Sequence, residues 1–339
     1  MNPFPRTWAL IGDKTGDNNQ LLALAEALGW PFETRSMRYN LLRSIPPRNL
    51  GSTTVSLTRA SRSQLSPPWP DLLLAIGRRS TPVARWIRDQ NKGRTKLVLV
   101  GHPRVEPELF DLVISTSQYP VPPRSNVLML PMAMSRLQDP GVPTEAERAW
   151  LATLPRPHLL FAIGGPTKYW EFEEHGFGEA LRQAIARAEC KGGTLIAVGS
   201  RRTPAEVIGA VADALAGTHH RLVEGGMPRF PLLMADADEI FVTGDSVSML
   251  SEAIQTGKPI GMVPIKMSRA GEKVLGGSNA LGHGWGYGRR DLRRMWEQLT
   301  CDGLVGTVAQ PCAGNIARDS VEMAASAVRR MMIDVDNDA

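Results

Sequence analysis

Residues 158–165 read His-Leu-Leu-Phe-Ala-Ile-Gly-Gly, in which an uninterrupted apolar run at 159–163 is followed by two glycines. A strand that is apolar on successive residues, and not on alternate ones, is typical of a parallel sheet buried on both faces. The pattern continues behind it with apolar runs at 194–198, 239–242 and 259–263 and helical patterns at 179–190, 205–215 and 247–255. This alternation predicts a doubly wound α/β domain from residue 158 onward.

The N-terminal half carries the same alternation. Its apolar runs are at 8–11, 71–76, 96–100, 112–115 and 127–130, and its helical patterns are at 20–28 and 81–89. Four prolines between 135 and 157 surround a polar segment, which is typical of a linker. With 339 residues the chain is long enough for two domains. We predict an N-terminal domain at 1–140, a linker at 141–157, a second domain at 158–316, and a C-terminal helix and tail at 317–339.

Composition limits the class of protein. No stretch approaches about 18 consecutive apolar residues, so we expect no membrane span. The first residues lead into a strand without the basic segment of a secretory signal. The three cysteines lack metal-site spacing, and we expect reduced thiols in a cytoplasmic protein. The glycine-dense segment 276–288 is either a loop beside a ligand or a surface loop.

Charge is divided unevenly along the chain. Residues 1–140 hold 18 Lys and Arg against 10 Asp and Glu, whereas the remainder is net acidic. Between residues 34 and 70 there are six arginines and no carboxylate; among them are Arg35, Arg38, Arg43 and Arg48. This stretch favours an anionic partner, either a phosphorylated acceptor or an anionic membrane surface. An ordinary solvated surface explains it equally well. Few aromatic residues accompany the arginines, so we expect no nucleic acid partner.

A glycine turn, Gly12-Asp13-Lys14-Thr15-Gly16-Asp17-Asn18, follows the first predicted strand. It matches neither a phosphate-binding Walker loop nor a dinucleotide-binding fingerprint. Open α/β sheets place their ligands at the carboxyl ends of strands, so Gly16, Asp17 and Asn18 are candidates for contact with an acceptor. The simpler interpretation is that Asp17 and Asn18 cap the helix that follows.

Two further turns come at strand ends in the second half. Gly164-Gly165 allows backbone amides to approach a phosphate, although a tight turn alone explains the pair. The second turn is Ser200-Arg201-Arg202-Thr203-Pro204. We expect Thr203 to cap a helix, Pro204 to lie in its first turn, and the arginines to reach a diphosphate.

The most informative motif is Thr243-Gly244-Asp245-Ser246-Val247-Ser248-Met249-Leu250-Ser251-Glu252-Ala253. A strand ends here in a polar turn, and the next helix opens with amides and hydroxyls suited to a phosphate. We predict donor-binding roles for Asp245, Ser246, Ser248, Ser251 and Glu252. The Glu252 carboxylate, about two turns into the helix, can accept both ribose hydroxyls of the same nucleotide.

With the Ser-Arg-Arg-Thr-Pro motif, this last motif resembles the ELM-type mitochondrial fission protein family. Many bacterial members of that family are classed as candidate glycosyltransferases. The resemblance implies the GT-B fold, α/β with two Rossmann-like domains facing each other across a cleft. More distantly, the chain is similar to the lipid-linked N-acetylglucosaminyltransferase of peptidoglycan synthesis. That similarity implies a catalytic base at Asp17, where the enzyme has histidine, a donor loop at Gly164-Gly165, and ribose binding by Ser251-Glu252.

We therefore predict an inverting, metal-independent glycosyltransferase with no cofactor. Its donor would be a nucleotide-diphosphate sugar, UDP-linked or similar, and its acceptor a sugar or lipid-linked glycan, with a peripheral contact to the inner face of the membrane left open. Asp236-Ala237-Asp238 follows an apolar helix, so we expect a helix end there and not a metal site. His102 is the next candidate for the base. A non-catalytic scaffold and a nucleotide-sugar epimerase or hydrolase remain alternatives.

Overall fold

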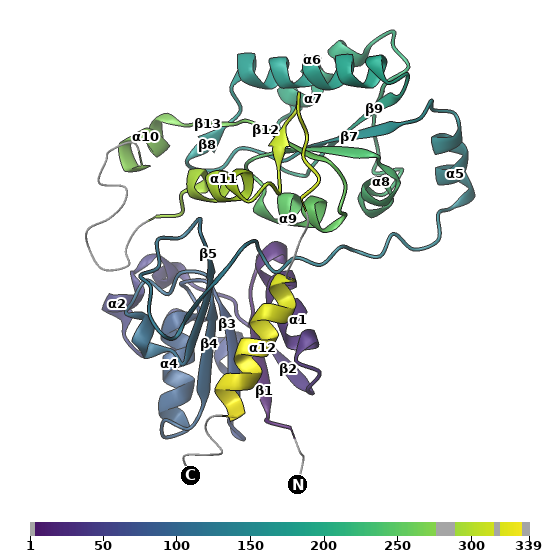
Figure 1. Ribbon diagram of the computed structural model, residues 1–339. Coiled ribbons are helices and arrows are strands. Elements are labelled where there is room, and N and C mark those ends of the chain that lie inside the picture. Colours follow the sequence, from purple (N-terminus) through teal and green to yellow (C-terminus); the bar gives the residue numbers. More distant parts are fainter. Residues whose placement is uncertain (1–3, 276–288, 315–318, 334–339) are drawn as a thin grey trace. The chain divides into compact units, whose positions relative to one another are not determined.

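The structure is a computed structural model that describes residues 4–275, 289–314 and 319–333. The chain divides into two compact units (Figure 1). The first unit holds residues 1–135, 278–291 and 318–339, and the second holds 136–277 and 292–317. The glycine-dense segment 276–288 lies outside the described residues. Within the described part of the chain, no helix has the length and apolar character needed to cross a membrane.

The first unit is built on a six-stranded parallel sheet of order β2-β1-β3-β4-β5-β6. Its strands are β1 (Thr7–Ile11), β2 (Phe32–Ser36), β3 (Leu72–Ile76), β4 (Lys96–Val100), β5 (Leu112–Thr116) and β6 (Val127–Leu130). Its helices are α1 (Thr15–Ala27), α2 (Pro47–Leu50), α3 (Arg59–Arg62), α4 (Thr81–Gln90) and α12 (Ser320–Ile333), with 3-10 turns η1 (Leu41–Ser44) and η2 (Pro107–Leu109).

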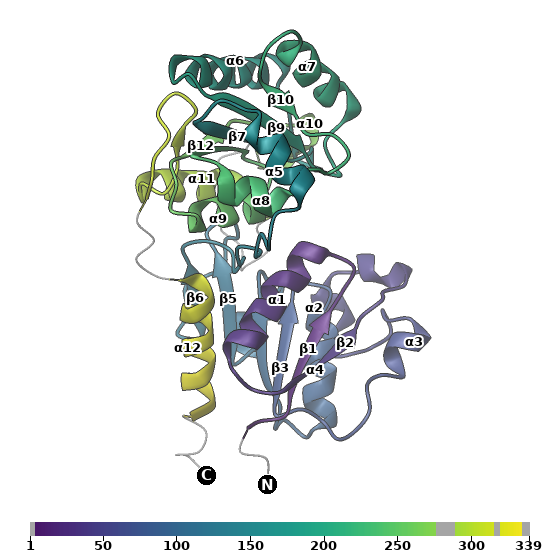
Figure 2. The same cartoon turned by 90° about the vertical axis from the view of Figure 1, so that its right-hand side faces the viewer.

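Both faces of this sheet are buried, as the continuous apolar strands require. On one face, Ala9, Leu72 and Leu74 pack against α1 and α12. On the other face, Trp8 and Leu73 pack against α4 and the loops around it. Figures 1 and 2 show α12 beside α1, although the two helices are about 300 residues apart in the chain. The C-terminal helix predicted near residue 317 is therefore part of the first unit.

The second unit has a six-stranded parallel sheet of order β10-β9-β7-β11-β12-β14 and a two-stranded antiparallel sheet of β8 and β13. Its strands are β7 (His158–Ile163), β8 (Trp170–Glu171), β9 (Thr194–Gly199), β10 (Arg221–Leu222), β11 (Glu239–Thr243), β12 (Ile260–Val263), β13 (Lys266–Met267) and β14 (Gly306–Thr307). Its helices are α5 (Glu145–Ala152), α6 (Glu174–Cys190), α7 (Ala205–Leu215), α8 (Phe230–Asp236), α9 (Val247–Gln255), α10 (Arg269–Leu275) and α11 (Leu292–Cys301).

Apolar side chains of β7 and β9 pack against α6 and α7, with Phe161 in contact with both Phe177 and Phe241. The segment 141–157, predicted as a linker, lies within this unit. It forms α5, which begins with a capping box between Thr144 and Glu147. The buried Glu147 carboxylate also binds the Arg229 guanidinium 2.8 Å away, at the start of α8. This ion pair attaches the segment to the unit and holds the pKa of Glu147 well below its usual range.

The structure corrects two details of the sequence interpretation. Helix α1 begins at Thr15, five residues before the predicted start, because its polar first turn continues directly into the apolar pattern. Strand β2 was missed because its sequence, Phe-Glu-Thr-Arg-Ser, is polar. An edge strand can be polar since only one of its sides pairs.

Candidate functional site

Three loops of the second unit begin at the carboxyl ends of neighbouring strands. Strand β7 lies between β9 and β11, so the turns at 164–165, 200–204 and 244–246 meet at one edge of the sheet. The chain passes from β7 to β9 on one side and returns to β11 on the other. This is the topological switch point at which open α/β sheets bind ligands.

The buried Asp245 carboxylate joins these three loops. It accepts hydrogen bonds from the Thr243 hydroxyl at 2.7 Å, from the Gly165 amide at 3.0 Å and from the Arg202 guanidinium at 3.1 Å. Thr243 in turn accepts a hydrogen bond from the Gly164 amide at 2.8 Å. Asp245, which the sequence predicted to contact the nucleotide-sugar donor, therefore accepts three hydrogen bonds within the protein, and these bonds hold the three loops together.

The same contacts explain why the first loop needs two glycines. A β-carbon at Gly164 would overlap the Asp245 carboxylate, and one at Gly165 would overlap the backbone carbonyl of Arg202. Neither neighbour can move without breaking the Asp245 contacts. Close packing between loops thus requires these glycines even before any ligand is considered.

Arg201 and Arg202 differ in their surroundings. The Arg202 guanidinium binds Asp245 and donates to the Gly165 carbonyl at 3.2 Å. Arg201 is exposed, and no hydrogen bond or ion pair holds its side chain among the described residues. Arg201 is therefore the arginine of this pair that is available to a ligand.

The predicted cap at Thr203 is wrong, because Pro204 occupies the N-cap position of α7. The Thr203 hydroxyl instead accepts from the Ser200 amide at 2.7 Å, and its single proton lies within reach of the carbonyls of both Ile163 and Gly164. These contacts of the Thr203 hydroxyl hold the turn against the end of β7.

Helix α9 begins beside Asp245. Ser246 is its N-cap, and the Ser246 hydroxyl accepts from the Met249 amide at 3.5 Å. Ser248 is partly exposed in the first turn, whereas Ser251 is completely buried in the packing of the unit.

The Glu252 side chain lies one turn beyond Ser248 and is half-buried. Among the described residues no hydrogen bond or ion pair reaches its carboxylate. Burial raises the pKa of Glu252 to about 7. A carboxylate that is desolvated and unpartnered is costly to the fold, and ionisable groups with strongly shifted pKa values cluster at functional sites.

A tryptophan that the sequence interpretation missed supports this site. The Trp296 indole N–H donates to the Gly244 carbonyl at 2.9 Å, and Trp170 packs edge-on against the Trp296 ring. Trp296 lies about 50 residues beyond the motif it supports, in a helix with no recognisable signature, so sequence spacing alone could not connect them.

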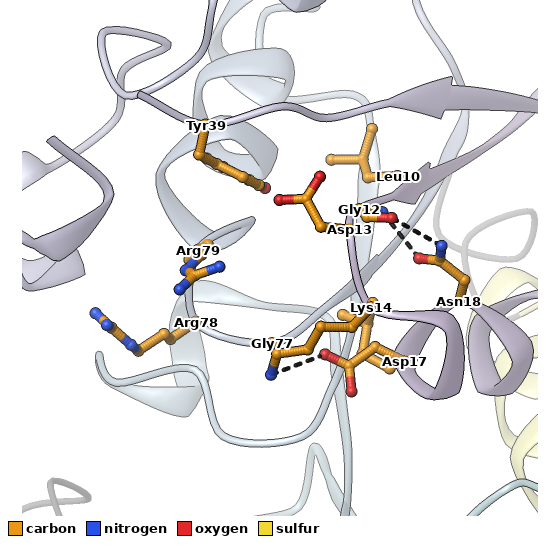
Figure 3. A pocket seen from close by; sticks show the side chains of 11 residues that line it. Leu10, Gly12, Asp13, Lys14, Asp17, Asn18, Tyr39, Gly77, Arg78 and Arg79 are labelled. Atoms are coloured by element: carbon orange, nitrogen blue, oxygen red, sulfur yellow. Dashed lines mark hydrogen bonds and ion pairs between the residues drawn. The ribbon is translucent and has the colours of Figure 1, made fainter. Parts of the chain in front are cut away.

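The first unit has a pocket of about 140 Å³ at the ends of β1 and β3 (Figure 3). Asn18 closes the glycine turn by bonding both the amide and the carbonyl of Gly12 at 2.8 Å. Asp17 lines the pocket, 3.4 Å from the Lys14 ammonium, and makes no hydrogen bond to the amides of α1 among the described contacts. Gly16 lies in the exposed first turn of α1. Neither Asp17 nor Asn18 caps the helix.

Tyr39, Arg78 and Arg79 also line this pocket and were missed from sequence. His102, the second candidate for the base, does not line it. The imidazole is buried, and its Nδ1 accepts from the Arg104 amide at 3.0 Å. Burial, with a smaller effect of Arg104, lowers the pKa of His102 to about 3, so the ring is neutral at physiological pH.

The Asp236-Ala237-Asp238 segment ends helix α8, as predicted. Asp236 accepts from His158 Nδ1 at 2.6 Å and pairs with Arg156. Asp238 accepts from the His158 amide at 2.7 Å. Both carboxylates thus anchor the start of β7.

Residues 15–290 match the family described as mitochondrial fission ELM1. The chain belongs to this family. It is 24% identical to the mitochondrial fission protein ELM1 of Arabidopsis thaliana, over 67% of this chain and 61% of that protein. It is 22% identical to an uncharacterised protein of Rickettsia prowazekii, over 75% of this chain and 81% of that protein. The chain thus spans less than two thirds of its Arabidopsis relative.

Several solved structures have a similar fold. The UDP-GlcNAc 2-epimerase of Neisseria meningitidis bound to UDP-GlcNAc has a TM-score of 0.52 at 11% identity, covering 97% of this chain and 100% of its own. The enzyme of Methanocaldococcus jannaschii has a TM-score of 0.51 at 11% identity, covering 97% and 99%. Together with the two parallel six-stranded sheets, they confirm the predicted fold class of two Rossmann-like domains of GT-B type.

Proposed function

We propose that this chain is an inverting glycosyltransferase that uses a nucleotide-diphosphate sugar, with the nucleotide held by the second unit. The observation that carries this proposal is Glu252, a half-buried and unpartnered carboxylate beside the start of α9 at the switch point of the sheet. Ribose hydroxyls are donors that would satisfy it. The similar structure of the Neisseria meningitidis enzyme, which is bound to UDP-GlcNAc, supports a ligand of this class.

Residues around Glu252 are suited to the diphosphate. The start of α9 presents backbone amides, favourable to an anion, beside the Ser248 hydroxyl. Arg201 adds an exposed guanidinium from the neighbouring loop, which can bind phosphate oxygens in a bidentate manner. Asp245 and Arg202 would act indirectly, by holding the three loops in place.

In the proposed reaction, the acceptor hydroxyl attacks the anomeric carbon of the donor sugar. The bond from that carbon to the phosphate oxygen breaks, and the nucleoside diphosphate leaves with the electron pair. Asp17 takes the hydroxyl proton, and a single displacement inverts the configuration. We propose that the reaction needs no metal ion, since helix amides and Arg201 can offset the charge of the leaving diphosphate.

A second candidate function, epimerisation or hydrolysis of the nucleotide sugar, is favoured by the similarity to UDP-GlcNAc 2-epimerases. The experiment that tests the proposal is a panel of nucleotide sugars, screened for thermal stabilisation of the full chain. Product analysis then separates the candidates. Sugar transferred to an acceptor supports the transferase, while a released or epimerised sugar without acceptor supports the alternative. No stabilisation by any nucleotide would favour a non-catalytic scaffold.

Glu252→Ala should weaken nucleoside-diphosphate binding by about 1.5–3 kcal/mol, because ribose loses a charged hydrogen-bond acceptor. Only the ionised carboxylate accepts both hydroxyls. With a pKa of about 7, it is mostly protonated at pH 6 and mostly ionised at pH 8, so wild-type affinity should rise about tenfold over that interval. Calorimetry at both pH values measures this. Protonation of the diphosphate affects binding to the wild type and to the variant equally. If the affinity of the variant depends on pH as that of the wild type does, Glu252 does not bind the ribose.

Glu252→Gln provides a second readout. The Glu252 carboxyl group binds its proton more tightly in the folded protein than in the unfolded chain. The wild type therefore loses stability as pH rises from about 4.5 to 7. Gln keeps the shape without the charge. The variant should therefore melt at a higher temperature than the wild type at pH 8 while binding nucleotide less tightly. A lower melting temperature would indicate that Glu252 has a structural partner.

We also propose that segment 38–62 of the first unit contacts an anionic membrane. Arg38 and Arg43 are exposed there, and the Leu41 side chain between them is 89% exposed. Basic residues around an exposed leucine suit a lipid surface. Arg35 belongs to the fold instead, since it lies over the Trp8 ring at 4.3 Å.

Replacing Arg38, Arg43 and Arg48 with Gln should release the protein from vesicles that contain phosphatidylserine, since each arginine contributes about 1 kcal/mol of attraction. Co-sedimentation measures the bound fraction. Wild-type binding should fall as salt rises and should be absent on phosphatidylcholine alone. If variant and wild type bind anionic vesicles equally, the segment is an ordinary solvated surface.

A further inference from the structure

The pocket of the first unit lies at a topological switch point of its own. The chain passes from β1 to β2 on one side of β1 and then to β3 on the other. The turns after β1 and β3 therefore separate, and the pocket opens between them. This is the position at which sheets of this strand order bind phosphate-bearing ligands.

The turn after β3 brings two adjacent arginines into this pocket without a counter-ion. Arg78 and Arg79 are both partly buried, and no hydrogen bond or ion pair joins either guanidinium to another described residue. Burial and the neighbouring Arg79 lower the pKa of Arg78. Two neighbouring guanidinium groups that are partly shielded from water repel each other, and a bound anion would offset that repulsion.

This turn repeats a motif of the second unit. Gly77-Arg78-Arg79-Ser80-Thr81-Pro82 resembles Gly199-Ser200-Arg201-Arg202-Thr203-Pro204, and each follows a buried strand and precedes a helix. In the second unit, Asp245 neutralises one arginine of the pair. No described carboxylate forms an ion pair with Arg78 or Arg79, although Asp13 lines the same pocket (Figure 3), so both guanidinium groups remain available to a ligand.

Charged side chains line the pocket on two sides. Figure 3 shows Arg78 and Arg79 on one side and Asp17 with Lys14 on the other. Tyr39 closes a third side. The partly buried Tyr39 side chain lines the pocket, no hydrogen bond joins its hydroxyl to another described residue, and burial raises the pKa of Tyr39. A ligand that carries both an anionic group and a hydroxyl would match this arrangement.

We infer that the pocket of the first unit binds a phosphate or diphosphate group of the acceptor. Arg78 and Arg79 hold the phosphate oxygens with help from Lys14, and the Tyr39 hydroxyl donates to them. The acceptor is thereby oriented with its reactive hydroxyl toward Asp17. This inference rests on the proposed function for its use in catalysis, but the anion site can be tested independently.

The test is calorimetry of the full chain with inorganic pyrophosphate, in the presence of saturating nucleoside diphosphate to occupy the proposed donor site. We expect one pyrophosphate per chain. Each arginine makes charged hydrogen bonds, so R78Q/R79Q should weaken binding by about 100-fold or more. K92Q/R94Q, which removes two positive charges at the other end of α4, should bind as the wild type does.

Unchanged binding by R78Q/R79Q would overturn the inference, as would pyrophosphate binding that the nucleotide fully displaces. The single variant R79Q serves if the double variant does not fold, and it should weaken binding by about tenfold or more. If no nucleotide binds, the proposed function fails but the anion site is still tested. Pyrophosphate can be titrated into the wild type and R78Q/R79Q without a nucleotide. Comparing farnesyl diphosphate with glucose 1-phosphate separates the two sources of the phosphate: the tighter ligand identifies a lipid-linked or a soluble acceptor.

Discussion

Asp17→Asn is expected to lower kcat by about 10²–10⁴-fold, the usual contribution of a general base. The Asp17 carboxylate lines the pocket where we propose that the acceptor hydroxyl lies. Because Asp17 makes no hydrogen bond to the amides of α1 in the described structure, the change should leave the melting temperature near that of the wild type. Nucleotide affinity should also stay near the wild-type value, since the proposed donor site belongs to the other unit.

The matched control is Asp13→Asn, which removes the same charge from the same pocket. We expect its effect on kcat to be only a few-fold. If Asp13→Asn reduces kcat as much as Asp17→Asn does, the assignment of the base within the pocket is wrong. An Asp17→Asn variant with wild-type kcat and lowered stability would show that Asp17 serves the fold. His102 is then a poor substitute, because its buried ring is neutral and outside the pocket.

Asp245→Ala is expected to abolish nucleotide binding and to reduce the free energy of unfolding of the second unit by about 3 kcal/mol. The substitution leaves the buried Gly165 amide and the buried Thr243 hydroxyl without their acceptor, and it also removes the counter-ion of the half-exposed Arg202. Each buried group left unsatisfied costs about 1–3 kcal/mol. For a unit of this size the change corresponds to roughly 6–12 °C in melting temperature, measured by calorimetry.

Asp213→Ala provides the control for this prediction, since it makes the same substitution at an exposed position of α7. It should change neither nucleotide affinity nor melting temperature appreciably. Should Asp245→Ala retain both stability and nucleotide affinity, the three loops do not depend on that carboxylate. Should it lose affinity while keeping its melting temperature, Asp245 contacts the nucleotide directly, as the sequence interpretation held.

Sequence alone predicted the parts of the fold that depend on continuous burial. Strand β7 is buried at every position and apolar at every position after His158, so its pattern has one interpretation. Strand β2 is polar and lies at the edge of the sheet, where burial does not constrain its residues. Helix α12 was predicted as a separate segment because nothing in its sequence records that it packs on α1.

The sequence predicted those parts of the candidate site that are formed by neighbouring residues. It did not predict the contacts between residues that are far apart in the chain. The turn after β11 and the start of α9 follow from neighbouring residues. Asp245 binds Gly165 and Arg202 because the strands before these loops are neighbours in the sheet. The motif around Asp245 gives no information on which strands are neighbours. The Arg78-Arg79 motif was overlooked because its resemblance to residues 199–204 is short and not periodic.

We propose above that the second unit binds the nucleotide. Amide hydrogen exchange of the full chain, read by mass spectrometry with and without the nucleotide that stabilises it most, tests this claim directly. We predict slower exchange at residues 163–168, 199–204 and 243–252, the three loops and the start of α9, and no change at residues 12–18 or 77–81. Protection confined to the first unit, or none in the second, would contradict the account.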